Sequence, residues 1–232
     1  MHNLSTEEWR VANEKAEVIL QVLKQTIVMP NWTVQQHKPL ETLIATIISQ
    51  NTADINTKRA FENLSKQFEV TPKILASAEI VTLEACLRVA GLYKSKAKAI
   101  KSVSKVIVER FYGSLDPVLS LPLDEARKTL LELQGVGPKT ADVVLLFSAR
   151  KPNVPVDTHV NRVSKRLGFA PSDGDYEAVR LNLQEVFEPN DYLTLHLLLI
   201  SLGRTYCKAR KPLCDICPVN SYCASRGFEE QK

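Results

Sequence analysis

The sequence predicts an all-α protein, and three observations support this prediction. Apolar residues recur at helical spacing in several segments; two such stripes are Leu43, Ile44, Ile47 and Ile48, and Val160, Val163 and Leu167. The segment 195–202 is apolar on every side, as expected of a buried helix. No segment shows the sustained period-two alternation of a half-buried strand. We therefore expect helices joined by short turns.

The bulk composition is that of an ordinary globular protein. Of 232 residues, 44% are apolar and 24% are charged, which allows a sizeable core. The net charge of +4 suits a polyanionic partner, although many proteins without such a partner share it. No apolar run is long enough to span a bilayer, and Met1–Arg10 lacks the apolar stretch of a signal peptide. We expect no membrane partner and a location in the cytoplasm or nucleoid.

Turn-forming residues divide the chain, and the clearest break is the proline-containing stretch 151–155. This break predicts two helical lobes. We expect the first lobe to span residues 33–151, and the second to combine residues 1–32 with residues 152–232.

A short turn with the sequence Gly135-Val136-Gly137 joins two predicted helices, and the second helix opens with Pro138. Glycines at a helix N-terminus leave backbone N–H groups exposed, and such groups can bind a phosphate oxygen without any side chain. The alternative is a plain αα-hairpin in which the glycines only close the turn. The tripeptide alone does not decide between these interpretations.

Lys139 falls in the first turn of the helix that begins at Pro138, where a cation opposes the helix dipole. Most lysines are solvated surface residues, and that interpretation stays open here. The functional interpretation is an amine nucleophile that forms a Schiff base. Neutralising a lysine at pH 7 requires about 4–5 kcal/mol, and a helix terminus contributes only about 0.3–2 kcal/mol. Desolvation by a substrate, or a nearby base, must supply the remainder.

Asp157 is a candidate for that base, because it follows the proline-containing break and precedes the helix with the stripe 160–167. Its position also predicts an N-cap for that helix. The two roles are compatible, since capping engages only part of a carboxylate.

Four of the five cysteines lie within seventeen residues near the C-terminus: Cys207, Cys214, Cys217 and Cys223. In a cytosolic chain such a cluster predicts metal ligands rather than disulfides. Four thiolates can hold a tetrahedral zinc or a 4Fe–4S cluster. Structural zinc sites usually have two Cys-x2-Cys pairs and this segment has one, so zinc remains the less favoured alternative. Cys86, among apolar neighbours, is expected to be a buried apolar residue.

Four cations lie close to or between the first two clustered cysteines, Cys207 and Cys214: Arg204, Lys208, Arg210 and Lys211. We expect phosphate contacts from this loop, with a solvated charged loop as the alternative. A second run, Lys94, Lys96, Lys98 and Lys101, is expected to be a solvated helix face.

The order of these motifs carries a family resemblance. Leu-Gln-Gly-Val-Gly-Pro-Lys-Thr-Ala, followed by Val-Pro-Val-Asp-Thr-His-Val with eighteen positions from Lys139 to Asp157, closely resembles the helix-hairpin-helix DNA glycosylase superfamily. The Cys-x6-Cys-x2-Cys-x5-Cys pattern narrows this to the endonuclease III branch. The resemblance covers about Leu40 to Cys223.

This resemblance implies a bifunctional enzyme of base excision repair. Lys139 would attack C1′ of the damaged nucleotide, release the base, and cleave the strand by β-elimination through a Schiff base. Asp157 would assist deprotonation of Lys139 and stabilise positive charge on the sugar. The four clustered cysteines would hold one 4Fe–4S cluster. The first lobe would be a six-helix domain with the helix-hairpin-helix, and the second an iron–sulfur cluster domain.

The implied partner is double-stranded DNA with a damaged base or abasic site, bound by a monomer. The target base must leave the stack, which requires side chains that fill the gap. Residues 48–52 resemble the segment that supplies a polar plug, usually Gln; here Asn51 stands at that position and Gln50 precedes it, so the identity of the plug stays open. Leu92 resembles an apolar wedge. The alternatives are that Gln50 and Asn51 cap a helix and that Leu92 packs.

The implied DNA-contacting residues are Gln50, Asn51, Leu92, Gly135, Val136, Gly137, His159, Lys208, Arg210 and Lys211. Oxidised pyrimidines are the expected substrates. Adenine excision is not expected, because Thr46 stands where adenine-excising relatives carry a catalytic Glu. Two other functions remain as alternatives: a mismatch (uracil or thymine) glycosylase with an idle Lys139, and a non-enzymatic helix-hairpin-helix DNA-binding protein.

Overall fold

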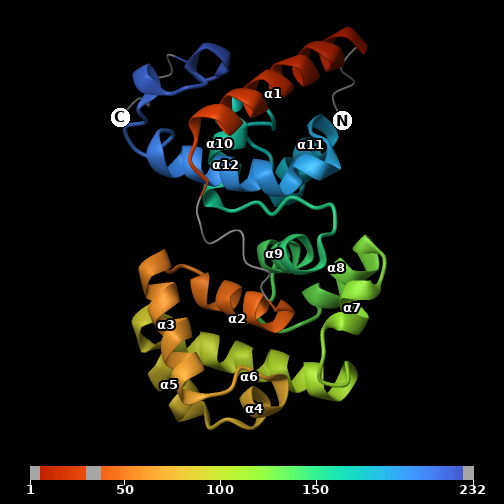
Figure 1. Cartoon of the computed structure of the whole chain (residues 1–232), viewed down its shortest axis with the longest axis vertical. Coiled ribbons are helices and arrows are strands. Elements are labelled where there is room, and N and C mark those ends of the chain that lie inside the picture. The colour runs from red at the N-terminus through yellow and green to blue at the C-terminus, as the bar shows by residue number, and fades with distance from the viewer. Residues whose placement is uncertain (1–5, 30–37, 227–232) are drawn as a thin grey trace. The chain divides into compact units, whose positions relative to one another are not determined.

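The computed structural model describes residues 6–29 and 38–226, and every regular element in these ranges is a helix (Figure 1). The α-helices are α1 (Thr6–Thr26), α2 (Pro39–Ser49), α3 (Asp54–Gln67), α4 (Pro72–Ser77), α5 (Ile80–Leu87), α6 (Tyr93–Arg110), α7 (Asp116–Ser120), α8 (Leu123–Leu131), α9 (Pro138–Ala149), α10 (Thr158–Leu167), α11 (Tyr176–Val186) and α12 (Tyr192–Thr205). Short 3-10 helices are η2 (Arg88–Ala90), η3 (Pro189–Asp191), η4 (Cys214–Ile216) and η5 (Asn220–Tyr222). The predicted all-α fold is confirmed. None of the helices in these ranges has both the length and the apolar character that crossing a membrane requires.

The chain forms two compact units, one with residues 38–151 and the other with residues 6–29 and 152–226 among those described. The first unit contains the eight helices α2 to α9 within residues 38–151, where the sequence analysis expects six. The difference lies in short elements, since α4 has six residues and α7 has five. A helix of less than two turns offers too short a window for apolar periodicity to be recognised.

Helix α2 provides the centre of the apolar core of the first unit. Its predicted stripe is confirmed, because all four side chains, Leu43, Ile44, Ile47 and Ile48, are fully buried. The helix packs against α3, α6 and α9. Its C-terminal end therefore lies on a well-packed support, which matters because the candidate gap-filling residues follow it directly.

The hairpin of α8 and α9 is held by a close backbone approach and by an ion pair. Gly135 has a φ of +86°, and a Cβ placed there would lie 2.6 Å from Cβ of Ala99 in α6, so only glycine fits. Arg127 Nε lies 2.7 Å from Oδ1 of the fully buried Asp142, which joins α8 to α9. Pro138 opens α9, as predicted.

In the second unit, α12 is the buried helix that the sequence predicts, because every residue of 195–202 is buried. Helix α10 buries Val160, Val163 and Leu167 and ends at Gly168, whose φ is +84°. It packs against α11 and α12, and α1 also contacts both of these helices.

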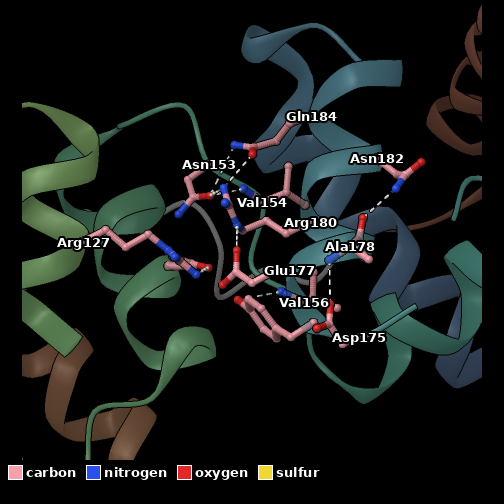
Figure 2. A network of polar contacts seen from close by, with 12 residues as sticks. Arg127, Asn153, Val154, Val156, Asp175, Glu177, Ala178, Arg180, Asn182 and Gln184 are labelled. Atoms are coloured by element: carbon pink, nitrogen blue, oxygen red, sulfur yellow. Dashed lines mark hydrogen bonds and ion pairs between the residues drawn. The ribbon is translucent and has the colours of Figure 1, made fainter. Parts of the chain in front are cut away.

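The connector 152–156 is buried rather than a surface linker, since residues 153–156 are shielded from solvent. Figure 2 shows Arg180 and Gln184 of α11 converging on Asn153, whose Oδ1 accepts from Arg180, Gln184 and the Val154 N–H at 3.0–3.3 Å. The Val156 N–H donates to Oη of Tyr176 at 3.3 Å. These contacts satisfy polar groups that burial would otherwise leave without partners.

Further along the same connector, the Pro155 carbonyl lies 2.9 Å from Nδ1 of His196 in α12. The connector is thus fixed from two helices immediately before Asp157.

We expect Asn153→Leu to lower the free energy of unfolding by about 1–3 kcal/mol, because it deprives the half-buried donors of Arg180 and Gln184 of their shared acceptor. Asn182→Leu is the matched control, since Asn182 is only half-buried and its amide donates to the Ala178 carbonyl within α11. Urea denaturation of both variants measures the difference. Equal losses of stability in the two variants would contradict the role assigned to Asn153.

Candidate functional site

Lys139 lies in the first turn of α9 and is half-buried. Its Nζ is 3.5 Å from Oγ of Ser49, the last residue of α2, which is a long contact. The Ser49 hydroxyl itself donates to the Thr46 carbonyl at 2.8 Å, so an oxygen lone pair is available to the ammonium. Lys139 is therefore set against the end of α2 and is not a freely solvated side chain.

The turn before Lys139 combines a buried residue with two exposed glycines. Val136 is only 6% exposed, and its N–H donates to the Leu133 carbonyl at 3.0 Å. Gly137 is exposed, has an ordinary φ of −94°, and has nothing within 4 Å of a Cβ placed on it. Packing within the chain therefore requires glycine at position 135 but not at position 137. The first-turn N–H groups of α9 lack intrahelical acceptors, so this turn can receive an anion.

Gln50 ties the end of α2 to this turn. Its Nε2 donates to the Gly135 carbonyl at 3.0 Å and lies 3.4 Å from Oγ1 of Thr140. Gln50 is the C-cap residue of α2, but its side chain forms its hydrogen bond with the hairpin turn. The structure thus brings together Gln50, Gly135 and the helix that carries Lys139.

Asn51 and Leu92 both have left-handed backbones and exposed side chains. Their φ angles are +51° and +47°, and Leu92 is 61% exposed. The alternative that Leu92 simply packs is wrong, because most of its surface faces solvent. A left-handed conformation is uncommon for a bulky residue such as Leu92, whereas asparagine adopts it more readily.

Asp157 is the N-cap of α10, as predicted. Its Oδ1 accepts from the backbone N–H groups of His159 at 2.9 Å and Val160 at 2.8 Å. Both bonds engage one carboxylate oxygen, and Oδ2 takes no part in them. Lys139 and Asp157 belong to different units of the chain.

His159 is half-buried beside Asp157, and burial lowers the pKa of its imidazole while the nearby Asp157 raises it. Its Nδ1 lies 3.2 Å from an Nη of Arg162. The imidazole packs against α12 at Gly203, where a Cβ would lie 3.0 Å from Nδ1. A neutral imidazole is suited to hydrogen bonding rather than to charge pairing with a phosphate.

The four clustered cysteines border one cavity of about 300 Å³, together with apolar residues such as Leu167, Leu202 and Val219. This volume is roughly ten times the share of one water molecule in the liquid. Within residues 6–29 and 38–226, no three His, Cys, Asp or Glu side chains meet in a group suited to a single metal ion. Burial raises the pKa of Cys217 and Cys223, and the neighbouring thiols raise it further. Four cysteines that line one cavity of this size fit an iron–sulfur cluster, which is larger than a single metal ion.

Two arginines of α10 hold the chain around these cysteines. Arg166 donates to the carbonyls of Lys208 at 2.7 Å and Ala209 at 3.2 Å, and it lies 3.6 Å from Sγ of Cys207. Arg162 donates from Nε to the Cys207 carbonyl at 3.0 Å. The three predicted phosphate-binding side chains of this loop, Lys208, Arg210 and Lys211, are exposed.

Sequence reasoning missed one buried cation. Lys96 was expected on a solvated face, but it is only 3% exposed. A signal was present, because Lys96, Ile100, Val103 and Ile107 share the helical spacing of the buried stripe of α6. The roles of Arg162 and Arg166 depend on tertiary contacts, and no local pattern identifies them.

Comparison with known proteins places these features in a family. Residues 44–189 match the family described as HhH-GPD superfamily base excision DNA repair protein. Residues 207–223 match the iron-sulfur binding domain of endonuclease III. The 4Fe–4S cofactor that the resemblance implies is thereby confirmed, in preference to zinc.

Among curated relatives, endonuclease III of Sulfolobus acidocaldarius is 42% identical over 183 residues, which are 78% of this chain and 80% of the relative. A trapped endonuclease III–DNA covalent intermediate has a TM-score of 0.77 and 29% identity, covering 96% of this chain and 97% of the other. A non-covalent endonuclease III–DNA complex has a TM-score of 0.80 and 30% identity, covering 92% and 96%. The chain therefore belongs to the HhH-GPD superfamily of base excision DNA repair proteins, in its endonuclease III branch.

Proposed function

We propose that this base excision repair enzyme, a DNA glycosylase and abasic-site lyase, uses Lys139 as its nucleophile. The position of Lys139 in the structure is the observation that supports this proposal. Lys139 is a half-buried amine in the first turn of α9, directly after an exposed glycine turn that can receive a phosphate. A similar protein has been captured as a covalent intermediate with DNA, which supports an enzyme-bound sugar.

Neutral Nζ of Lys139 forms a bond to C1′ as the glycosidic bond breaks, and the base leaves with the bonding electron pair and gains a proton. A proton then passes from Nζ to the ring oxygen O4′ as the C1′–O4′ bond breaks, which opens the sugar ring and gives a protonated Schiff base. Loss of a C2′ proton lets the C3′–O bond break, and the 3′ phosphate leaves. Bound DNA desolvates the amine and so supplies part of the roughly 4–5 kcal/mol that its neutralisation requires at pH 7.

Asp157 is the proposed partner of Lys139 in this chemistry, as base and as counter-charge to the sugar. Its Oδ1 already holds two N–H groups of α10 at 2.8–2.9 Å. These bonds fix the orientation of the carboxylate. A fixed carboxylate stabilises developing positive charge with little reorganisation.

The proposed DNA contacts divide into phosphate grips and gap fillers. The turn 135–137 would hold one phosphate through backbone N–H groups, and Lys208, Arg210 and Lys211 would contact others. Asn51 is the proposed polar plug, because its side chain is exposed while Gln50 is engaged with the hairpin. Leu92 is the proposed apolar wedge. His159 would form a single hydrogen bond, as donor or acceptor, with the DNA backbone.

Cys207, Cys214, Cys217 and Cys223 are the proposed ligands of the 4Fe–4S cluster. When bound, the cluster supplies four strong bonds that cross-link a loop with little apolar core of its own. Arg162 and Arg166 then hold the backbone of that loop, so its exposed cations keep a fixed spacing.

The proposed substrates are oxidised pyrimidines in double-stranded DNA, excised by a monomer in the cytoplasm or nucleoid. The absence of a Glu at Thr46 supports a target other than a mismatched adenine. A panel of duplexes that each contain one lesion tests this preference by rates of base release.

Borohydride trapping on duplex DNA with an abasic site tests the nucleophile. We expect wild type to form a covalent adduct on a denaturing gel and Lys139→Gln to form none, because an amide cannot form a Schiff base. Lys94→Gln, at an exposed lysine, is the control that keeps the adduct. Tight DNA binding by wild type without any adduct would contradict the proposal and favour one of the two alternatives. Base release without strand cleavage would indicate the mismatch glycosylase.

Asp157→Asn separates capping from chemistry, because Asn is about as good an N-cap as Asp. We expect the free energy of unfolding to change by less than about 0.5 kcal/mol. The single-turnover rate of base release should fall by about 100-fold or more, as for loss of a general base. Thermal melting and a quenched-flow assay measure the two quantities. A large loss of stability with an unchanged rate would show that Asp157 is only a cap.

The two glycines of the hairpin turn should respond differently to alanine. Gly137→Ala should leave stability unchanged but weaken DNA binding by about tenfold, because a methyl group displaces a phosphate from an N–H contact of about 1.5 kcal/mol. Gly135→Ala should instead lower stability by about 1–3 kcal/mol, since its Cβ collides with Ala99. Fluorescence anisotropy and thermal melting distinguish the two. Unaltered DNA affinity in Gly137→Ala would contradict the phosphate grip.

A further inference from the structure

Lys96 is a buried ammonium whose three N–H donors meet three acceptors. Its side chain lies in α6 and is 3% exposed. Nζ donates to the Ile48 carbonyl at 2.7 Å, to the Ala90 carbonyl at 2.9 Å, and to Oγ1 of Thr52. Because an ammonium has three donors, this set satisfies Lys96 completely.

The acceptors belong to two different chain segments. The Ile48 carbonyl lies in the last turn of α2, where carbonyls have no intrahelical partner, and Ala90 ends η2. Thr52 joins the two segments, because its hydroxyl lies within hydrogen-bond distance of the Ala90 carbonyl and accepts from Lys96. A cation suits the C-terminal end of a helix, where the dipole is negative.

These two segments carry the candidate gap fillers. Asn51 lies between Ile48 and Thr52, and Leu92 lies two residues after Ala90. Both have positive φ angles and both expose their side chains. A left-handed conformation persists in a bulky residue only where the surrounding structure imposes it. The Lys96 ammonium bonds to both segments, and the Thr52 hydroxyl links them directly.

We propose that Lys96 is a positioning residue that holds Asn51 and Leu92 at one fixed separation, so that both enter the duplex together when a nucleotide leaves the stack. The inference rests on the proposed function, specifically on the assignment of Asn51 and Leu92 as gap fillers. Lys96 itself does not touch DNA in this role.

Stability alone does not account for a lysine at this position. Burial lowers the pKa of Lys96 because the charged form is desolvated. An apolar side chain of similar volume fills such a site without the cost of burying a charge. An ammonium differs from an apolar side chain because its three directional N–H donors fix the positions of three acceptors relative to one another. A second lysine of α6, Lys101, donates to the Ala78 carbonyl at 2.6 Å, after α4. That segment carries no candidate DNA contact, so Lys101 provides a matched control.

The test measures gap filling without catalysis. The probe is a duplex with a tetrahydrofuran abasic analogue, which has no aldehyde for Lys139, opposite 2-aminopurine. We expect saturating wild-type protein to raise the 2-aminopurine fluorescence, because the opposite base loses its stacking. Lys96→Met should reduce this rise at saturation by about threefold or more, since the plug and wedge no longer enter together. Lys101→Met should retain the full rise.

Kinetics provide an independent measurement. For a lesion in a fully paired duplex, Lys96→Met should lower the single-turnover rate of base release by about tenfold, equivalent to about 1.4 kcal/mol. For the same lesion in a one-nucleotide bulge, where no opposite base must be separated, the rate should change by less than about twofold. A purely structural role would lower both rates equally. Thr52→Val, which keeps the shape but removes the shared hydroxyl, should give the same pattern and replaces Lys96→Met if that variant does not fold.

The possible failures are distinguishable. A full fluorescence rise in both Lys96→Met and Thr52→Val, or an equal loss in Lys101→Met, overturns the positioning role. The absence of any rise with wild type also overturns it, because nothing then enters the duplex. Wild type that raises the fluorescence but forms no borohydride adduct overturns the proposed nucleophile and leaves the role of Lys96 supported.

Discussion

The close approach of Gly135 to Ala99 is the constraint on which the unit of residues 38–151 depends. It presses the hairpin turn against α6, and it leaves no space for any side chain at Gly135. Lys96, three residues earlier on α6, binds the end of α2 and the end of η2. Gln50 then links the end of α2 back to the Gly135 carbonyl. Helix α6 therefore contacts the candidate phosphate-binding turn and both candidate gap-filling segments, and so holds them in fixed relative positions.

The other unit positions its functional groups by burying a connector. Asn153, Tyr176 and His196 satisfy the polar groups of residues 153–156, and the chain then enters α10 with Asp157 as its cap. From α10, Arg162 and Arg166 reach the carbonyls of the cysteine loop. Helix α10 thus connects the candidate acid at its N-terminus to the cofactor loop near its C-terminus. A carboxylate and a basic loop far apart in sequence depend on the same short helix.

Structural features that depend on a local residue pattern could be predicted from the sequence. The helical stripes, the Asp157 cap, Pro138 at the start of α9 and the metal-binding character of the cysteine segment each follow from residue types at fixed spacing. The choice of 4Fe–4S over zinc came from the family resemblance. Lys96 bonds to Ile48 and Thr52, which lie 48 and 44 positions away, and Gln50 bonds to Gly135, which lies 85 positions away. These partners were missed, because no local pattern specifies them. The short helices α4 and α7 have too few residues to display a period, so no apolar stripe indicates them. The assignment of Leu92 as a wedge came from resemblance, and only its backbone angle and exposure separate it from a packing residue.

The left-handed backbone at Leu92 has a consequence for the search for damage. A repair enzyme encounters a great excess of intact base pairs, and it must release each one quickly. A probe that became ordered only on contact would lose conformational entropy at every encounter. If Leu92 and Asn51 fill the gap as proposed, the fold already holds their backbones in the exposed conformation, and the backbone entropy is lost once, when the chain folds. The free-energy cost of testing a base pair then depends mainly on how easily that pair separates. This is the property that distinguishes a weakened pair from an intact one.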